Sequence, residues 1–239
     1  MDQHTVDMLC FGAHPDDVEI GMAGTIHKHV RDGLKVGIVD LTKGELSSNG
    51  TVAGRQREAA QAADILGVEQ RVNLGFPDRG LTVNDALLWK IVVLVRRFRP
   101  KVVCLPYAED RHPDHRQTAR IVEEAVFSAN IRKYQREQDA VPPHRVEQMY
   151  YYFFNEVAKP DVIIDISEQM EIKKKALLAY ASQFQAEAAE VETRLNTGFV
   201  EAIEARDQLF GKWVNVRYAE AFVVKQPLLL QQLILRKGV

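Results

Sequence analysis

The feature that most constrains the fold is a regular alternation of short apolar runs with longer amphipathic stretches through roughly the first 130 residues. Each apolar run predicts a strand, and each stretch with apolar residues three and four apart predicts a helix. Parallel strands need crossover connections of this length, which are almost always right-handed. We therefore predict an α/β, Rossmann-like fold, a single domain over residues 1–239 with a mostly parallel sheet flanked by helices. The predicted strands are 6–11, 36–41, 71–74 and 101–105, and the predicted helices are 21–31, 55–66, 84–98 and 115–130.

The remainder of the chain is less regular. Ser167 is a candidate cap for a helix that ends at Tyr180, and residues 187–209 form a second helical stretch. Residues 42–54 are polar and contain glycine, so we expect a mobile loop there. No linker-like composition, repeat or low-complexity block divides the chain. The later predicted strands are 148–154, 162–166 and 217–224.

Composition excludes several classes of protein. Hydrophobic residues make up 46%, charged residues 27%, and the net charge is -2, so no basic surface is indicated for nucleic acid. No apolar stretch is long enough to span a membrane, and the N-terminus lacks the features of a signal peptide. Cys10 and Cys104 lie in predicted strands, where we expect them to be buried and unbridged. We expect a cytoplasmic protein that binds neither nucleic acid nor membrane.

An apolar pattern at helical spacing recurs near the C-terminus, in residues 228–235. Such a pattern is typical either of a last core element or of a contact between subunits. We favour the second interpretation, which predicts a homo-oligomer.

Two loops of similar chemistry follow the first and fourth predicted strands. Residues 13–17 read AHPDD, and residues 111–115 read RHPDH. Ligands of an open parallel sheet bind outside the carboxyl ends of its strands, which is where both loops are expected to lie. The proline restricts its own backbone and that of the preceding histidine, so each loop should be stiff. A single HPD tripeptide is commonplace, but two at strand ends of one sheet indicate a site.

The side chains of these loops suit a catalytic metal. Catalytic zinc takes three protein nitrogen or oxygen ligands and leaves one position for water. His14, Asp17 and His115 supply two imidazoles and a carboxylate. Such a set also accepts iron(II) nearly as well, so Zn²⁺ is the expected cofactor and Fe²⁺ the alternative.

The remaining polar side chains of the loops suit acid–base chemistry. Asp16 diverges from its neighbour Asp17, so it can face the attacking water as a general base. His112 would lie across the site and stabilise a developing oxyanion, with Asp114 holding it protonated. Asp114 has a second interpretation as the N-cap of the helix that starts at His115.

The paired motifs resemble those of the LmbE-like, or PIG-L-like, deacetylases. The resemblance extends to residues 55–67, 76–80, 180–185 and 218–220, and so spans most of the chain. It implies a Rossmann-like sheet and zinc-dependent removal of the acetyl group from an N-acetylglucosamine conjugate. It also implies that His14, Asp17 and His115 are zinc ligands and that Asp16 is the general base. It further implies that His112 is an electrostatic catalyst, oriented by the carboxylate of Asp114.

Within this family the chain most resembles the deacetylases of bacillithiol biosynthesis, which act on N-acetylglucosaminyl-malate. Mycothiol-branch relatives carry a mobile tyrosine two residues before the catalytic histidine. Here that position is Asp110, with Tyr107 upstream in the same predicted loop. The difference favours the bacillithiol branch and leaves open whether Tyr107 takes the tyrosine's place.

Three residues near the expected site are candidates for substrate binding. Arg55 follows the polar loop, where it is either a partner for an anionic malate group or a solvated surface residue. Asp78 and Arg79 follow the third strand. Asp78 either accepts hydrogen bonds from sugar hydroxyls or shapes the turn after Pro77.

Two other functions remain open. One is deacetylase or amidase activity on another N-acetylated sugar, such as a chitobiose-type sugar or a thiol conjugate, with Arg55 as the residue that distinguishes them. The other is a catalytically inactive module that binds metal or sugar. The intact Asp16 argues against that module, since simple binding does not require a free carboxylate beside the metal.

Overall fold

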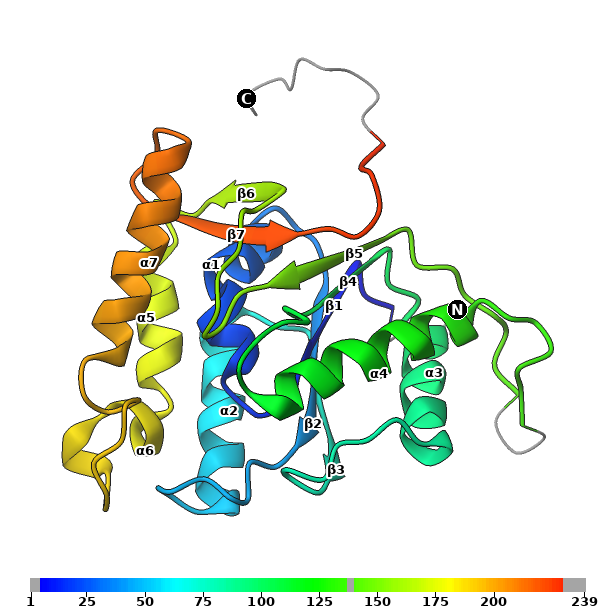
Figure 1. Cartoon of the computed structure of the whole chain (residues 1–239), viewed down its shortest axis with the longest axis horizontal. Helices are drawn as coiled ribbons and strands as arrows, with labels where there is room; N and C mark the ends of the chain where they lie inside the picture. Colours follow the sequence, from blue (N-terminus) through cyan, green and yellow to red (C-terminus); the bar gives the residue numbers. More distant parts are fainter. Residues whose placement is uncertain (1–4, 137–139, 230–239) are drawn as a thin grey trace.

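The computed structural model describes residues 5–136 and 140–229, and in this part the chain forms a seven-stranded sheet of order β3-β2-β1-β4-β5-β7-β6 (Figure 1). The first five strands along the chain pair in parallel, and the last two join antiparallel beyond β5. The predicted mostly parallel α/β fold is confirmed. The strands are β1 (Met8–Gly12), β2 (Val36–Thr42), β3 (Gln70–Phe76), β4 (Val102–Pro106), β5 (Gln148–Tyr152), β6 (Val162–Asp165) and β7 (Ala219–Val223).

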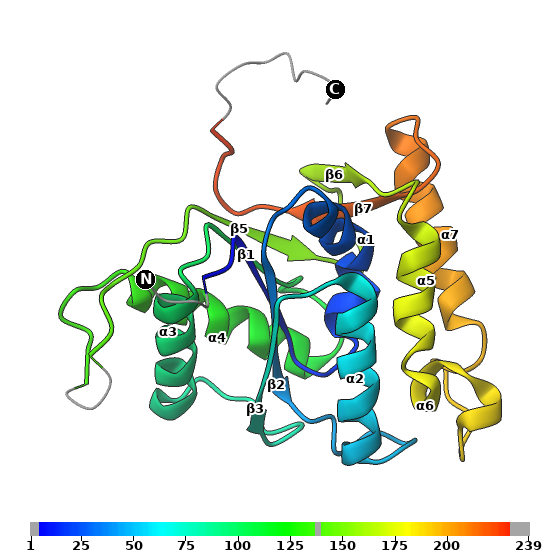
Figure 2. The same cartoon turned by 180° about the vertical axis from the view of Figure 1, so that it is seen from behind.

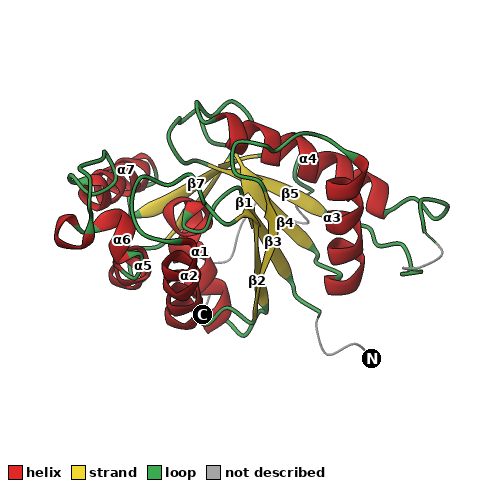
Figure 3. Cartoon of the chain, turned by 90° about the horizontal axis from the view of Figure 1, so that it is seen from below, coloured by secondary structure: helices red, strands yellow, loops and turns green. Residues whose placement is uncertain are grey.

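Helices cover both faces of the sheet, as the views from behind and from below show (Figures 2 and 3). α3 and α4 pack together on one face, while α1, α2 and α5 pack together on the other, with α7 beside α5. The helices are α1 (Asp17–Arg31), α2 (Val52–Leu66), α3 (Asp85–Phe98), α4 (Pro113–Ala129), α5 (Met170–Leu178), α6 (Ala181–Phe184) and α7 (Phe199–Trp213), with a short 3₁₀ helix, η2 (Ala186–Ala188).

The alternating side chains of the central strands divide the core between the two faces. Leu9 and Phe11 of β1 pack under α3 and α4, whereas Cys10 packs on the opposite face under α1 and α2. A sheet buried on both faces has continuous apolar strands, which is the pattern that the sequence shows. Cys10 and Cys104 are register partners in β1 and β4, and both are buried and unbridged, as predicted.

α1 begins earlier than predicted, at Asp17 instead of residue 21. Its residues from Asp17 to Ile26 are all buried, so the first half of the helix shows no amphipathic pattern from which its start can be recognised. Met22 has non-helical backbone angles, which kinks the helix. A side chain at Gly21 would collide with the Tyr152 ring, so this glycine permits the close packing of α1 on β5.

Two further sequence predictions are wrong in detail, and a third segment has contacts that the sequence did not reveal. Ser167 does not cap α5, because its hydroxyl donates to Asp165 and accepts from the Tyr218 amide instead; the N-cap is Gln169. The helix predicted over 187–209 starts only at Phe199. The loop expected to be mobile is tied to the C-terminal part by Asn49, which is buried and hydrogen-bonded to Val191.

The apolar pattern at residues 228–235 lies almost entirely outside the described residues. The described helices include none with the length and apolar character that crossing a membrane requires.

Candidate active site

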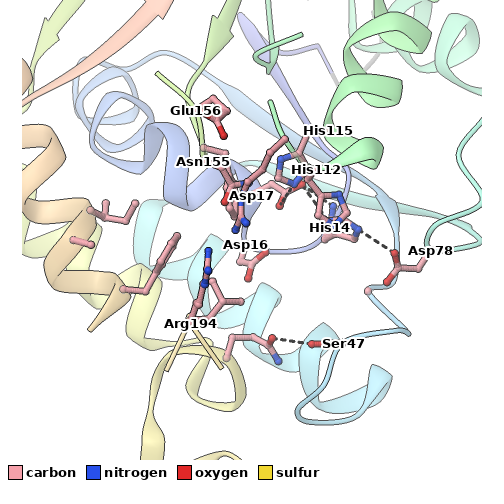
Figure 4. Close-up of a pocket in the computed structure, with 18 of the residues that line it drawn as sticks. His14, Asp16, Asp17, Ser47, Asp78, His112, His115, Asn155, Glu156 and Arg194 are labelled. Atoms are coloured by element: carbon pink, nitrogen blue, oxygen red, sulfur yellow. Dashed lines mark hydrogen bonds and ion pairs between the residues drawn. The ribbon is translucent and has the colours of Figure 1, made fainter. Parts of the chain in front are cut away.

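The two motif loops meet at the carboxyl edge of the sheet, between β1 and β4 (Figure 4). This is the point where the strand order reverses, because the chain runs outward from β1 to β3 and then returns to β4. The structure brings His14, Asp17 and His115 together, with one possible ligand atom from each within 4.8 Å of the others. His14, His112 and Asp114 form a second, overlapping group by the same measure.

Asp17 is fixed by its own loop. Its Oδ2 accepts hydrogen bonds from the amides of Ala13 (2.8 Å) and His14 (2.9 Å), and its Oδ1 lies 3.3 Å from Nε2 of His115. Burial alone would raise the pKa of Asp17, but the two histidines hold it well below its ordinary value. The carboxylate is therefore charged and aimed at the other two members of the group.

His115 is oriented by a carboxylate that the sequence did not single out as functional. Nδ1 of His115 lies 3.0 Å from Oδ1 of the fully buried Asp110, which leaves Nε2 facing Asp17. Asp110 also accepts hydrogen bonds from the amides of His112 and Asn155. Burial favours a raised pKa for Asp110, but His115 and these amides lower it overall. A carboxylate behind a histidine is the usual support of a metal ligand.

His14 lies among carboxylates. Its Nε2 is 3.1 Å from Oδ1 of Asp78 and 3.5 Å from Oδ2 of Asp114. Burial alone would lower the pKa of His14, yet the negative charge of Asp17 and its neighbours raises it well above the ordinary value. The site thus favours a positive charge at His14. Together, the imidazoles of His14 and His115 and the carboxylate of Asp17 match the donor set that a divalent metal such as zinc takes.

Asp16 stands beside this group in a strained conformation. Its φ of 112° lies in the left-handed region, where non-glycine residues are uncommon, and it is the N-cap of α1. Burial raises the pKa of Asp16 to about 7, with Arg55 lowering it and Asp17 raising it. A carboxyl group that titrates near neutral pH is suited to taking and returning a proton.

Arg55 has a different environment from either of those expected from the sequence. It is buried, with 6% of its surface exposed, and its Nε and Nη2 donate to the Pro15 carbonyl at 2.9 and 2.7 Å. Nη2 also lies 2.8 Å from Oδ2 of Asp16. The interpretation as a solvated surface residue is therefore wrong. These contacts hold the strained Pro15–Asp16 segment in place. A substrate-binding role for Arg55 stays a prediction, because its guanidinium is already engaged by the protein.

His112 and Asp114 are close, but not through the predicted contact. Nδ1 of His112 accepts a hydrogen bond from the Asp114 amide at 3.2 Å, so His112, and not Asp114, caps α4. The Asp114 carboxylate instead accepts from the Arg79 amide at 2.8 Å and from its guanidinium at 3.2 Å. Burial and the two neighbouring histidines lower the pKa of His112. The Asp114 carboxylate raises the pKa of His112, but less than burial and the two histidines lower it, and a neutral His112 would carry its proton on Nε2.

Asp78 and Tyr107 also have protein partners. Oδ1 of Asp78 faces His14, and Oδ2 accepts from the Leu46 amide at 3.1 Å, so its carboxylate links His14 to the loop after β2. The Tyr107 hydroxyl donates to Glu109 at 3.3 Å, and its ring packs against Phe153. Tyr107 is not among the residues that line the pocket described below, so no contact supports it as a substitute for the tyrosine of the mycothiol branch.

These side chains form one side of a pocket of about 750 Å³. All the site residues predicted from the sequence line it except Asp114, which is buried behind His14 and Arg79. Phe154–Val157 line the pocket next to the catalytic group, because the centroid of the Phe154 ring lies 4.5 Å from that of the His115 ring and the Asn155 amide donates to Asp110. The opposite side, here called the distal wall, consists of the lining residues between 194 and 206. The sequence did not reveal it, because these residues carry no recognisable motif. Its members include Arg194, Leu195, Phe199, Ile203 and Arg206.

Comparison with known proteins gives consistent matches. The model of the family described as PIG-L: GlcNAc-PI de-N-acetylase matches residues 9–126. A diacetylchitobiose deacetylase from Thermococcus kodakarensis is 32% identical over 89% of this chain and 80% of that protein. A probable N-acetyl-alpha-D-glucosaminyl L-malate deacetylase 2 from Bacillus anthracis is 26% identical over 80% of this chain and 87% of that protein. The crystal structure of the conserved protein TT1542 from Thermus thermophilus superposes with a TM-score of 0.87 at 38% identity, covering 96% of this chain and 99% of that one.

The fold, the His–Asp–His group and these relatives define a metal-dependent N-deacetylase, a hydrolase of linear amides. The chain belongs to the PIG-L family, whose members are also called LmbE-like deacetylases. The resemblance recognised in the two sequence motifs is thereby confirmed.

Proposed function

We propose that the protein removes the acetyl group from the N-acetylglucosamine unit of a small-molecule conjugate and releases acetate. The observation that carries this proposal is Asp16. Its buried carboxyl group, with a pKa of about 7, stands directly beside a group of side chains suited to a divalent metal. Simple metal or sugar binding does not need such a group, and Arg55 would not be required to hold it.

The metal would be held by His14, Asp17 and His115, and we propose Zn²⁺, with Fe²⁺ as the alternative. Once bound, such an ion supplies Lewis acidity, which polarises an amide carbonyl. Asp110 holds the ring of His115 from behind, and Asp78 holds the ring of His14 from within the pocket wall. This support limits the movement of the ligands during the reaction.

Asp16 supplies the proton transfers. As the carboxylate it takes a proton from the attacking water, and as the acid it delivers that proton to the departing amine. Arg55 keeps its oxygen in place, because Nη2 contacts Oδ2 while the same guanidinium holds the Pro15 carbonyl. The strained backbone at Asp16 thus aims its side chain into the pocket.

His112 is the proposed stabiliser of the oxyanion that develops on the acetamide oxygen. Its Nδ1 is occupied by the Asp114 amide, so Nε2 carries the proton that can be donated to this oxygen. The ring lies next to the metal group, with its centroid 5.0 Å from that of His14 and 4.7 Å from that of His115. The Asp114 carboxylate holds Arg79 and makes no direct contact with the His112 ring.

For the aglycone we propose malate, as in N-acetylglucosaminyl-malate of bacillithiol biosynthesis. The support is the resemblance to that branch, the Bacillus anthracis relative, and a cation on the distal wall that has no protein partner among the described residues, Arg194. Diacetylchitobiose is the second candidate, since the relative from Thermococcus kodakarensis acts on it and the apolar distal wall suits a second sugar ring.

An acetate-release assay on both substrates tests these proposals. The values of kcat/KM for N-acetylglucosaminyl-malate, N,N′-diacetylchitobiose and methyl N-acetylglucosaminide should be measured side by side with zinc-loaded enzyme. We expect acetate from the malate conjugate at the highest rate. A higher rate on diacetylchitobiose would establish the second candidate, and no acetate from any of the three would refute the proposed function.

Two expectations concern the protein in the cell. We propose that it acts as a homo-oligomer in the cytoplasm. Sedimentation analysis tests the first point, with a monomer as the contradicting result, and fractionation of the source cells tests the second.

A further inference from the structure

We propose that Arg194 selects substrates by binding an anionic group, a carboxylate or a phosphate, on the aglycone. This inference rests on the proposed function, because it assigns the part of the pocket that receives the aglycone. It replaces Arg55, whose guanidinium is already engaged by Pro15 and Asp16.

The first observation is that most arginines in the pocket are already engaged. Arg79 pairs with Asp114, and Arg206 binds Asp207 and backbone carbonyls, including that of Ile20. Among residues 5–136 and 140–229, the structure gives no side-chain partner for Arg194 or for Arg111. A cation that faces a pocket without a counter-charge is available to a ligand.

The position of Arg194 separates it from Arg111. Arg111 lies in the catalytic loop, directly before His112, so its charge acts at the acetamide end of the pocket. Arg194 is exposed on the distal wall and points into the pocket from the side opposite His14 and His112 (Figure 4). A sugar whose acetamide lies against the catalytic side directs the rest of the molecule toward this wall.

The second observation is that the backbone around Arg194 is held in place. The side chain of Asn49 bonds Val191 in both directions, accepting from its amide at 2.8 Å and donating to its carbonyl at 2.8 Å. Asn196 accepts from the Thr193 amide at 2.9 Å and also donates to the Val191 carbonyl at 2.9 Å. Both asparagines are buried. Because this turn is fixed from within, less freedom is lost when its arginine binds a ligand.

The surroundings strengthen the interaction and give it direction. Leu195, Phe199 and Ile203 line the distal wall together with Arg194, and a bound aglycone that covers this apolar surface would reduce the screening of a charge pair. On the catalytic side, the guanidinium of Arg55 is already paired with Asp16. An anionic aglycone therefore finds an unpaired cation on the distal wall, and binding there places the neutral acetamide at the catalytic side.

The test compares Arg194→Gln with a matched control, Arg145→Gln. Arg145 is exposed, lies before β5 at the other edge of the sheet, and has no side-chain partner within the described part of the chain. The substrates are N-acetylglucosaminyl-malate, a phosphate-bearing N-acetylglucosamine glycoside and neutral methyl N-acetylglucosaminide. Arg194→Gln should lower kcat/KM by about 10–100-fold on the preferred anionic substrate. It should change the neutral substrate by less than about twofold, and Arg145→Gln should change neither.

Charge reversal gives a second readout. Arg194→Glu should lower the rate on the anionic substrate further and should raise the rate on a glycoside with a cationic aglycone. The assignment would be overturned if Arg194→Gln lowered kcat/KM equally on anionic and neutral substrates. It would also be overturned if neither Arg194→Gln nor Arg194→Glu lowered kcat/KM on an anionic substrate. Larger loss on the malate conjugate identifies a carboxylate as the ligand, and larger loss on the other anion identifies a phosphate.

Calorimetry separates failure of this inference from failure of the proposed function. Binding of the deacetylated product, glucosaminyl-malate, needs no turnover. If no substrate releases acetate, the proposed function fails. The anion site would still be supported if wild type bound this product at least tenfold more tightly than Arg194→Gln does. Equal binding by wild type and variant of both glucosaminyl-malate and a phosphate-bearing glucosamine glycoside would overturn the anion site, whatever the turnover assay shows.

Discussion

The two sides of the pocket differ in how completely their charged groups are paired. On the catalytic side, Asp17, Asp110 and Asp16 each have partners within the protein, mostly from rigid strand ends and helix starts. On the distal wall, Arg194 is exposed without a partner among the described residues, amid apolar side chains. The family model covers residues 9–126, which contain the catalytic side but not the distal wall. The difference leads to the proposal that the chemistry belongs to the part of the fold matched by the family model, whereas substrate selection belongs to the part outside it.

The largest effect is expected from removing the proposed general base on the catalytic side, Asp16. Asp16→Asn keeps the shape of the side chain but cannot take a proton, and positioned general bases contribute about 10²–10⁴-fold. We expect kcat to fall by that factor with every substrate while zinc content, measured by elemental analysis, stays unchanged. Turnover within about threefold of wild type at full zinc occupancy would show that Asp16 is not the base.

Arg55→Ala should remove the side chain that holds Asp16 and the Pro15 carbonyl in place. The change leaves the buried Asp16 and the Pro15 carbonyl without their donor, and an unpaired buried group costs about 1–3 kcal/mol or more if charged. We expect kcat/KM to fall by about 10–100-fold, equally on malate and neutral conjugates. A loss confined to the malate conjugate would instead establish Arg55 as the anion-binding residue expected from the sequence.

Asp110→Asn tests the support of His115. N–H groups of His112, His115, Asn155 and Glu156 now point at the Asp110 carboxylate. The NH₂ group of an asparagine would face at least one of them, so that hydrogen bond would be lost. Loss of such support lowers metal affinity by about 10–100-fold. Zinc titration against a fluorescent chelator measures this, with thermal unfolding as the control for folding. Unchanged zinc affinity in a folded variant would remove Asp110 from the metal site.

The smallest effect is expected on the distal wall. Phe199 stacks on Phe184 with ring centroids 6.0 Å apart and is part of the pocket lining. Phe199→Leu should raise KM by about three- to tenfold and leave kcat and zinc content unchanged, because an aromatic contact is worth about 0.5–1.5 kcal/mol. A fall in kcat or in zinc content would show that the two sides of the pocket are not independent.

The parts of the molecule that the sequence predicted are those with local signals. The strands that became β1, β2 and β4 are mainly apolar, and the helix predicted over 84–98 is α3, whose N-cap is Asn84. The two motif loops follow directly from β1 and β4, so the parallel sheet alone places them at one edge. The sequence could therefore predict that His14, Asp17 and His115 lie together, although it could not give their distances.

The parts that the sequence did not predict depend on partners far away along the chain. Asn49 holds the turn at Val191, 142 residues later, and this contact makes a fixed wall from a segment predicted as helix. Arg55 looks like any helix-start arginine until the Pro15 carbonyl, 40 residues earlier, is found beside it. In the sequence, Asp110 only occupied the position of the tyrosine that mycothiol-branch relatives carry. In the structure, Asp110 orients the His115 ring through a contact with Nδ1.

The central claim, that His14, Asp17 and His115 hold a catalytic metal for amide hydrolysis, is tested most directly by metal removal. Wild type and His115→Ala should be stripped with a chelator and titrated with Zn²⁺ while acetate release from an N-acetylglucosamine conjugate is followed. We predict that stripped wild type is inactive and recovers fully at about one zinc ion per chain, whereas His115→Ala recovers neither zinc nor activity. A stripped wild type that keeps its rate, or a His115→Ala variant that recovers like wild type, would contradict the claim.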